Sequence, residues 1–206
     1  MPTTFVAAVL KSGYLVADRT FDRMYPPALR FLSQQHWTPV AVASRAAQLL
    51  VEAGASRILD VGCGPGKFCI TGALTTDAIF TGIDLRQQLV EIARAVAFRI
   101  GAGRARFLHA DALRFPFRRF DGFYLYNPFY ERLDPAVVPI DDTLGLSPQT
   151  FQRCVLKTTR KLARLPVGVA VVTYHGFGGV MPENYSRVHQ EGAGTDRLDL
   201  WIKTNP

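Results

Sequence analysis

The segment Ile58–Phe68, with the sequence ILDVGCGPGKF, constrains the fold more than any other part of this chain. It begins with apolar residues that suit a strand buried on both faces, and it continues into a pattern typical of a helix. Between the two lie three alternating glycines, Gly62, Gly64 and Gly66. A glycine has no β-carbon, so the backbone can approach a ligand closely, and the amides that open the next helix can point at that ligand. The segment predicts a strand, a ligand-binding turn and a helix.

The spacing of the glycines indicates which ligand this is. A dinucleotide fingerprint would need its third glycine at position 67, which is Lys67. The pattern Asp-x-Gly-x-Gly-x-Gly instead resembles the cofactor loop of class I S-adenosylmethionine (SAM)-dependent methyltransferases. This resemblance implies SAM as cofactor, bound by Asp60, Gly62, Cys63, Gly64 and Gly66. A tight turn that binds no ligand is the alternative.

Short apolar runs alternate with helical patterns after residue 56, which predicts a parallel sheet. We expect strands at 57–61, 79–83, 105–109, 119–126 and 167–174, and helices at 66–75, 86–101 and 148–164. The tail alternates apolar and polar residues on both sides of 191–196 and predicts an antiparallel hairpin. The resemblance therefore implies a doubly wound α/β fold with a mostly parallel seven-stranded sheet. Residues 1–37 would form a helical N-terminal extension or lid, and residues 38–206 the SAM-binding, Rossmann-like methyltransferase domain.

The first 56 residues contain helical fragments and no strand-like alternation of useful length. Thr38 is a good N-cap with Pro39 in the first turn, so a helix should begin there and end at Gly54. Many members of the family cover the cofactor with the corresponding segment, so Trp37 and Thr38 are candidate lid contacts. Packing in the core is the simpler interpretation of Trp37.

The second strand ends in Asp84, an acid 18 residues after Gly66. A carboxylate at this edge can accept both ribose hydroxyls, and the resemblance implies the same role, with Leu85 against the adenine. Capping of the following helix is an alternative role for Asp84.

Asp111 and Ala112 follow the third strand, where members of the family recognise the adenine edge. A salt bridge with Arg106 or Arg114 is the alternative for Asp111. His109, nearby in the strand, is interpreted as a packed or partly exposed residue.

The fourth strand runs into Asn127-Pro128-Phe129-Tyr130. This resembles the Asn/Asp-Pro-Pro-Tyr/Phe motif of amino-methylating family members, which implies that Asn127 and Pro128 accept hydrogen bonds from a target amine and that Tyr130 stacks on it. We therefore expect Asn127, Pro128 and Tyr130 to be catalytic, with Asn127 also beside the cofactor, and the acceptor atom to be nitrogen. Phe129 replaces the second proline, and Asn-Pro is also an ordinary turn initiator.

His175 follows the fifth strand at the same edge of the sheet. It could meet substrate or serve as a base for an oxygen acceptor, but a structural histidine beside a flexible loop is the simpler interpretation.

The composition leaves the acceptor open. A formal charge of +7, from 24 basic and 17 acidic residues, permits an anionic partner such as nucleic acid or an acidic protein. Seven arginines lie between Arg94 and Arg119, and a second basic cluster falls on the helix at 148–164, where a solvated face is the simpler interpretation. Three cysteines without a Cys-x-x-Cys pair indicate reduced thiols. With no signal peptide or membrane-spanning stretch, we expect a cytoplasmic protein that does not contact a membrane.

These features together predict a SAM-dependent methyltransferase that needs no metal. Methyl transfer depends mainly on positioning two reactants and excluding water, so no catalytic triad is expected. A nicotinamide- or flavin-dependent oxidoreductase is disfavoured by Lys67 and by the C-terminal hairpin. The alternative from another class is a non-catalytic subunit that binds SAM or nucleic acid.

Overall fold

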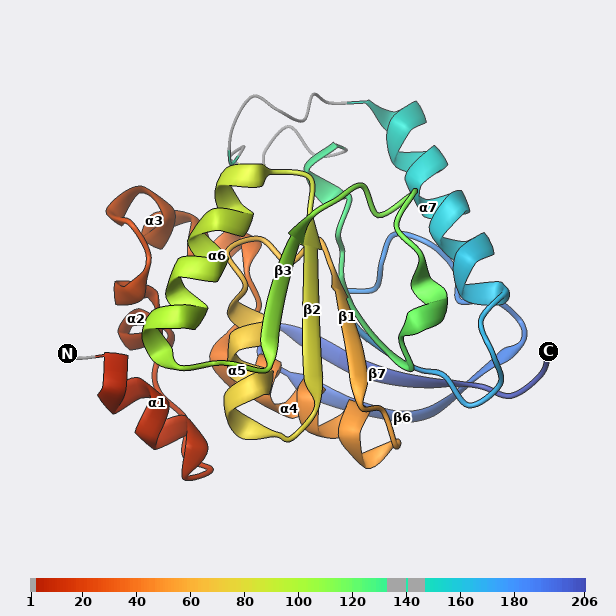
Figure 1. The fold of residues 1–206 in the computed structure, drawn as a ribbon. Coiled ribbons are helices and arrows are strands. Elements are labelled where there is room, and N and C mark those ends of the chain that lie inside the picture. Colours follow the sequence, from red (N-terminus) through yellow and green to blue (C-terminus); the bar gives the residue numbers. More distant parts are fainter. Residues whose placement is uncertain (1–2, 133–139, 141–146) are drawn as a thin grey trace.

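A seven-stranded sheet forms the centre of the molecule (Figure 1). The computed structural model describes residues 3–132, 140 and 147–206. The strand order is β3-β2-β1-β4-β5-β7-β6, and neighbouring strands are parallel except for the pairs that β7 makes with β5 and β6. The strands are β1 (Arg57–Val61), β2 (Ile79–Asp84), β3 (Ala105–His109), β4 (Gly122–Tyr126), β5 (Ala170–Tyr174), β6 (Tyr185–Ala193) and β7 (Asp196–Lys203). The predicted fold class is confirmed.

The alternation of side chains along the buried strands produces two cores. Ile58, Tyr124 and Val172 belong to the core shared with the N-terminal helices and with α4, α5 and α6. Leu59 and Phe123, their neighbours in sequence, face a second core that contains Leu162 of α7. The helices are α4 (Val40–Glu52), α5 (Lys67–Thr75), α6 (Gln87–Ile100) and α7 (Pro148–Ala163). Each of the last three starts and ends within one residue of its predicted bounds.

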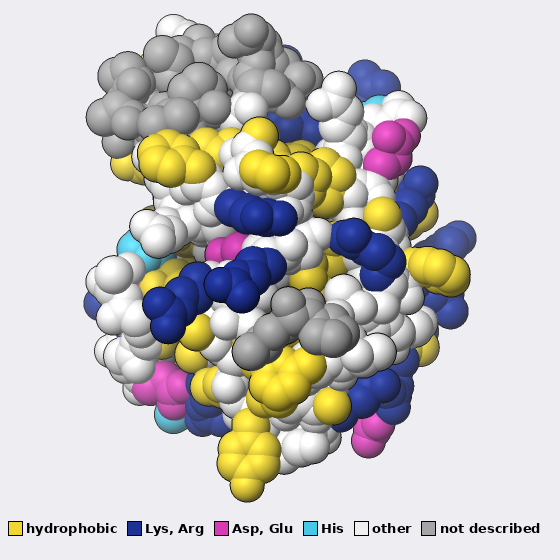
Figure 2. All heavy atoms as spheres, turned by 90° about the vertical axis from the view of Figure 1, so that its left-hand side faces the viewer, with side chains coloured by type: hydrophobic (Ala, Val, Ile, Leu, Met, Phe, Trp, Pro, Cys, Tyr) yellow, Lys and Arg dark blue, Asp and Glu magenta, His cyan; other side chains and the backbone are white. Residues whose placement is uncertain are grey.

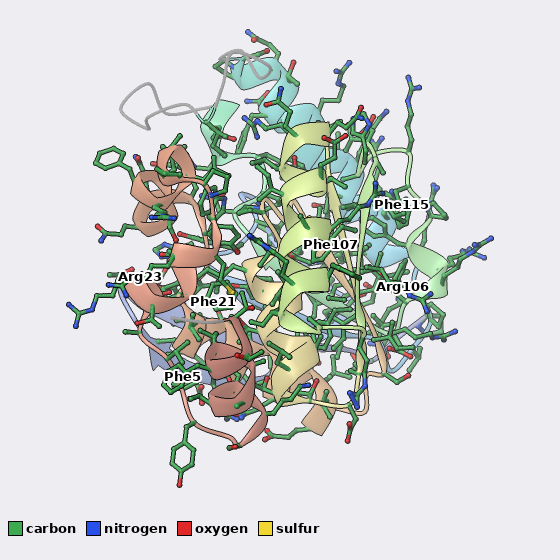
Figure 3. All side chains as sticks on the ribbon, turned by 60° about the vertical axis from the view of Figure 1, so that its left-hand side comes forward. Phe5, Phe21, Arg23, Arg106, Phe107 and Phe115 are labelled. Atoms are coloured by element: carbon green, nitrogen blue, oxygen red, sulfur yellow. The ribbon has the colours of Figure 1, made fainter. Side chains whose placement is uncertain are left out.

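Three short helices precede α4 and lie beside α5 and α6 (Figure 1). They are α1 (Thr3–Lys11), α2 (Asp18–Phe21) and α3 (Pro27–His36), with a 3₁₀ turn η1 (Asp22–Met24) between the last two. Phe21 of this segment is fully buried and Arg23 points outward (Figure 3). The segment ends where the expected lid ends, but its apolar side chains belong to the core shared with α4 and α5. The division of the chain at residue 37 stays a prediction.

The start of α4 differs from the expectation. Thr38 is not its N-cap, because the Thr38 hydroxyl hydrogen-bonds the Tyr124 hydroxyl at 2.9 Å. The helix begins at Val40, whose backbone N–H donates to Asp18 Oδ1 at 2.9 Å. A carboxylate from another helix therefore replaces the local cap. The end of α4 is as predicted, since Gly54 follows it with a left-handed φ of 88°.

Two strands are shorter than predicted because turns occupy their first residues. A 3₁₀ turn, η2 (Phe117–Arg119), precedes β4 and is closed by the Phe120 N–H donating to the Phe117 carbonyl. Gly168, with a φ of 88°, precedes β5. The C-terminal hairpin is tighter than expected, because β6 extends to Ala193 and β7 starts at Asp196. None of the described helices is both long and apolar enough to cross a membrane.

Lys67, the first residue of α5, holds the N-terminal helices in place. Its side chain is 2% exposed, and its Nζ lies 2.6 Å from Asp18 Oδ1 and 2.8 Å from Asp22 Oδ1. The same amine donates to Ser33 Oγ at 3.0 Å. A lysine opposes the helix dipole at this end of a helix, so the two carboxylates compensate a charge that the local sequence does not favour.

Removing the Lys67 amine should therefore destabilise the protein. Lys67→Met leaves Asp22 buried without its counter-charge, and loss of one partner of a buried pair costs about 3 to 5 kcal/mol. Chemical denaturation measures this, and Lys67→Met/Asp22→Asn should recover part of the loss. Arg104→Gln, which removes an exposed pair with Asp77, is the control and should cost no more than about 1 kcal/mol. Equal losses in Lys67→Met and Arg104→Gln would show that the Lys67 pairs do not anchor the segment.

Candidate functional site

Two adjoining cavities lie at the carboxyl ends of β1, β2 and β4, with volumes of about 490 and 160 Å³. Open α/β sheets bind ligands at this edge. The residues that line both cavities are Gly62, Asp84, Arg86 and Pro128. The larger one also contains Gly64, Trp37, Asn127, Tyr130 and His175. The smaller one contains Leu85, Asp111 and Ala112. Most of the residues predicted for cofactor and acceptor thus surround one continuous site.

The glycines of the loop are required by their neighbours. A β-carbon on Gly62 would lie 3.1 Å from Pro128 Cβ, and one on Gly64 would lie 2.7 Å from Trp37 Nε1. Both glycines also have left-handed backbones, with φ of 79° and 53°. Any other residue would push these neighbours away and fill the floor of the larger cavity.

Asp84 is almost completely buried at the centre of the site. Its Oδ2 accepts from the Gly64 N–H at 3.0 Å, and its Oδ1 accepts from the Arg86 N–H at 2.8 Å. Burial raises the pKa of this carboxyl, and the two backbone hydrogen bonds oppose the increase. Asp84 is not the N-cap of the following helix, which begins at Gln87 after Arg86 and has no side-chain cap; its bond to the Arg86 N–H closes a turn just before that helix, and its carboxyl lines both cavities.

An ion pair that we did not expect lies beside Asp84. Arg86 Nη2 is 2.9 Å from Glu131 Oε2, and both side chains are largely buried. Glu131 belongs to the 3₁₀ turn η3 (Tyr130–Arg132) after β4. The pair is invisible in the sequence, because it joins the ends of two strands that are far apart along the chain.

The smaller cavity contains the three residues predicted to meet adenine. Asp111 Oδ1 accepts from the Leu113 N–H at 2.8 Å, and Arg114 lies 3.7 Å from Oδ2, so the alternative salt bridge is also formed. Lys161 of α7 donates to the Ala112 carbonyl at 2.5 Å and to the Phe115 carbonyl at 2.6 Å. Burial lowers the pKa of Lys161. This lysine was expected on a basic helix face, but it fixes the loop that lines the cavity.

Asn127 begins a turn at the end of β4. Its carbonyl accepts from the Tyr130 N–H at 3.1 Å, so the turn closes although Phe129 stands in place of a second proline. The Asn127 amide group makes no hydrogen bond with any described residue, and it lines the larger cavity. The residue is therefore a turn initiator and a candidate ligand at the same time.

His175 faces the same cavity from the end of β5. Its Nδ1 lies 2.9 Å from Asp196 Oδ2 in the hairpin. Asn127 and His175 are the described non-glycine residues with left-handed backbones, with φ of 38° and 53°, and the Asn127 N–H donates to the Gly176 carbonyl next to His175. Burial raises the pKa of the adjacent Tyr126 to about 12, so this phenol stays protonated near neutral pH.

Three of the predicted cofactor residues are not among those that line the two cavities. Cys63 is buried beside Gly82, Gly66 is covered by Phe107, and Asp60 lies beneath α5. Asp60 is 4% exposed and accepts a hydrogen bond from Cys69 Sγ at 3.5 Å. Their contact with a cofactor stays a prediction. His109 is exposed, and its Nε2 hydrogen-bonds the Leu85 carbonyl.

The arginines between Arg94 and Arg119 do not share one face of the molecule. Figure 2 shows basic side chains across the face made by the N-terminal helices and α6. Arginines in this part of the chain also connect elements, since Arg94 donates to the Phe107 carbonyl and Arg99 to the Met24 carbonyl. Arg106 lies on the opposite side of β3 from Phe107 (Figure 3). The exposed positive charge is therefore distributed over several faces.

A family model described as a methyltransferase domain matches residues 58–139, which contain the glycine loop, Asp84, Asp111 and Asn127. This part of the chain is thus similar to methyltransferase domains, and the fold is that of class I SAM-dependent methyltransferases. The match extends from β1 past the end of β4, and so covers the glycine loop and the ends of β2 and β4, whereas Trp37, Thr150 and His175 of the two cavities lie outside it.

Curated methyltransferases resemble part of this chain. The O-methyltransferase cnsE of Penicillium expansum is 42% identical over 88 residues, which are 41% of this chain and 32% of the relative. The 27-O-demethylrifamycin SV methyltransferase of Amycolatopsis mediterranei is 34% identical over 77 residues, 37% of this chain and 28% of the relative. The chain thus matches less than a third of the length of these relatives.

Two solved structures share the fold over most of the chain. TrmN from Thermus thermophilus has a TM-score of 0.60 and 23% identity, covering 88% of this chain and 52% of that one. An RNA methyltransferase from Salinibacter ruber, in complex with S-adenosyl-L-homocysteine, has a TM-score of 0.57 and 20% identity. The match covers 82% of this chain and 94% of that one. Because both structures are less than 25% identical to this chain, the similarity concerns the fold alone.

Asp60 should make the stability of the protein depend on pH. Burial raises the Asp60 pKa from 3.8 to about 7, so the folded state binds a proton that the unfolded state has lost. Its contribution to the free energy of unfolding therefore falls as the pH rises from about 4 to 7, by roughly 4 kcal/mol, and is constant above that. Asp60→Asn keeps an acceptor for Cys69 and abolishes this titration. Chemical denaturation at several pH values measures the free energy of unfolding of both proteins. The difference between Asp60→Asn and the native protein should increase in favour of the variant from about pH 4 to 7. If the two free energies instead changed with pH in parallel, the raised pKa of Asp60 would be excluded.

Proposed function

We propose that the protein is a methyltransferase that transfers the methyl group of SAM to an acceptor held beside Asn127. The observation that carries this proposal is that Gly62, Gly64 and Asp84 share a cavity with Asn127. Three features fit SAM. The glycine loop forms a cavity floor that any β-carbon would fill, the buried Asp84 carboxylate can accept from the ribose, and the smaller cavity, with Leu85 and Asp111, can hold the adenine.

The bound cofactor supplies an electrophilic methyl group on a sulfonium. The protein has to orient the acceptor toward it and exclude water. Buried Arg86 and Glu131 form one wall of the larger cavity, and Trp37 forms another. Neither a metal nor a covalent enzyme intermediate is part of this mechanism.

We propose nitrogen as the acceptor atom. An amine or amide needs its hydrogens held by fixed acceptors, so that its lone pair can face the methyl group. Asn127 Oδ1 and the Pro128 carbonyl could serve as these acceptors, and Tyr130, 39% exposed at the cavity, could stack on a planar group. Since the Asn127 amide has no partner among the described residues, its acceptor oxygen is available to a ligand.

An oxygen acceptor is the second candidate. A hydroxyl usually needs a base to remove its proton during transfer. His175, hydrogen-bonded through Nδ1 to Asp196, faces the larger cavity and could serve as that base. The curated relatives named above are also described as O-methyltransferases or as acting on a 27-O-demethyl compound, although the matches cover only part of each protein.

The acceptor that we propose is anionic, either nucleic acid or an acidic protein. Support comes from the net charge of +7 and from exposed basic residues such as Arg106, Arg118, Arg153 and Arg160. Long-range attraction by such charges raises the association rate with an anionic partner and weakens as salt is added.

Cofactor binding can be tested at Asp84. Asp84→Ala removes the proposed hydrogen bonds to the ribose and the one that holds the Gly64 amide, so the affinity for SAM should fall about ten- to a hundred-fold. Isothermal titration calorimetry with SAM, S-adenosylhomocysteine and NAD measures this, and the native protein should not prefer NAD. Asp77→Ala, an exposed acid at the opposite end of β2, is the control. Unchanged affinity in Asp84→Ala would remove Asp84 from the cofactor site.

The acceptor atom can be tested at Asn127. Asn127→Ala should lower turnover by about a hundred-fold or more and leave SAM affinity nearly intact, because the lost contacts belong to the acceptor and its transition state. Asn127→Gly, which relieves any strain at this left-handed position, should be equally impaired. Activity is measured as methyl transfer from radiolabelled SAM to a fractionated cell extract. If the methylated product were an ester or an ether, and if the His175→Asn and Asp196→Asn variants were inactive, the acceptor atom would be oxygen and the nitrogen proposal would be wrong.

A further inference from the structure

Trp37 lies on the glycine loop in a way that its place in the sequence does not reveal. It follows the last residue of α3 and is 6% exposed. Its ring lies 5.7 Å from the ring of Tyr25, and its Nε1 is 2.7 Å from the point where a β-carbon of Gly64 would be. The indole nitrogen therefore lies directly above the loop, at the wall of the larger cavity.

The indole N–H of Trp37 is a donor without a partner in the described part of the chain. No described residue accepts a hydrogen bond from it, although the side chain is more than nine-tenths buried. An indole nitrogen can only donate, and Trp37 borders the larger cavity, where water can accept from it. A ligand that displaces this water has to supply an acceptor, because a donor left unsatisfied is costly.

Lys67 holds Trp37 at this position. The Trp37 backbone N–H donates to the Ser33 carbonyl at 3.2 Å, and the Ser33 hydroxyl accepts from Lys67 Nζ at 3.0 Å. The end of α3 is thus bonded to the first residue of the helix that follows the glycine loop. Because Lys67 is also paired with Asp18 and Asp22, its charge is already balanced by the protein.

The arrangement of the two cavities indicates which part of the cofactor reaches Trp37. The adenine would occupy the smaller cavity, and the ribose would lie at Asp84, which borders both. The amino-acid end of SAM then extends into the larger cavity, where Gly64 and Trp37 meet. We propose that Trp37 Nε1 donates a hydrogen bond to the carboxylate of the methionine part of the cofactor. The inference rests on the proposed function, since it assigns a ligand to the cofactor site.

The carboxylate contact predicts a difference between two ligands. S-adenosylhomocysteine carries the amino-acid group, whereas 5′-methylthioadenosine has the same nucleoside without it. Trp37→Phe keeps an aromatic ring beside Tyr25 and removes the N–H. By calorimetry, this variant should bind S-adenosylhomocysteine at least ten-fold more weakly than the native protein and bind 5′-methylthioadenosine equally well. Trp201→Phe, whose Nε1 donates to Thr173 Oγ1, is the matched control and should change neither affinity.

A second measurement uses native tryptophan and does not depend on how Trp37→Phe folds. The chain has two tryptophans, so ¹⁵N-labelled protein gives two indole N–H signals, and Trp201→Phe assigns them. The Trp37 signal should shift strongly with S-adenosylhomocysteine and weakly with 5′-methylthioadenosine. The carboxylate contact would be wrong if both ligands shifted the Trp37 signal equally, or if Trp37→Phe lowered the affinity for both ligands equally. Either result would leave the proposed function in place. If the native protein bound neither ligand, the cofactor site itself, and with it the proposed function, would be wrong.

Discussion

Close packing against the glycine loop is the constraint on which the rest of the site depends. A β-carbon at any of the three loop glycines would lie within 3.1 Å of a neighbour from another part of the chain. These neighbours are Pro128 against Gly62, Trp37 against Gly64 and Phe107 against Gly66. The loop therefore serves as a floor for the cofactor and as the point where the N-terminal segment, β3 and the turn after β4 meet. A substitution at any of these glycines would therefore displace the neighbour that packs against it.

The N-terminal helices belong to the site because of one lysine. Lys67 occupies the position where a dinucleotide loop would have a third glycine, and its amine extends away from the cavity toward Asp18 and Asp22. Asp18 also accepts from the first amide of α4. The two acids thus join α2, α4 and α5 around a buried charge, which fixes the direction in which α3 delivers Trp37. Lys67 acts on the cofactor site only through this arrangement.

Local patterns in the sequence were sufficient for the fold and for part of the site. Strand and helix periodicity located the sheet, because apolar runs and glycines act within a few residues of one another. The motif positions Gly62, Asp84, Asp111 and Asn127 were found for the same reason, since each lies within two residues of the carboxyl end of a strand. Contacts between distant parts of the chain were not predictable. No local pattern shows that Asp18 replaces Thr38 as the cap of α4, that Lys161 fixes the Ala112 loop or that Arg86 pairs with Glu131.

The ends of β4 and β5 are where the acceptor chemistry is decided. Asn127 and His175 have left-handed backbones, which L-residues adopt at a cost of about 1 to 3 kcal/mol unless a short polar side chain reduces it. The hydrogen bond from Asn127 to the Gly176 carbonyl couples the two positions, so neither turn can relax alone. Asn127 presents an acceptor oxygen to the cavity, and His175 presents a ring oriented by Asp196. Transfer to nitrogen needs the Asn127 oxygen at the end of β4, and transfer to oxygen needs the His175 ring at the end of β5. The two candidate reactions therefore depend on neighbouring strand ends that one hydrogen bond couples.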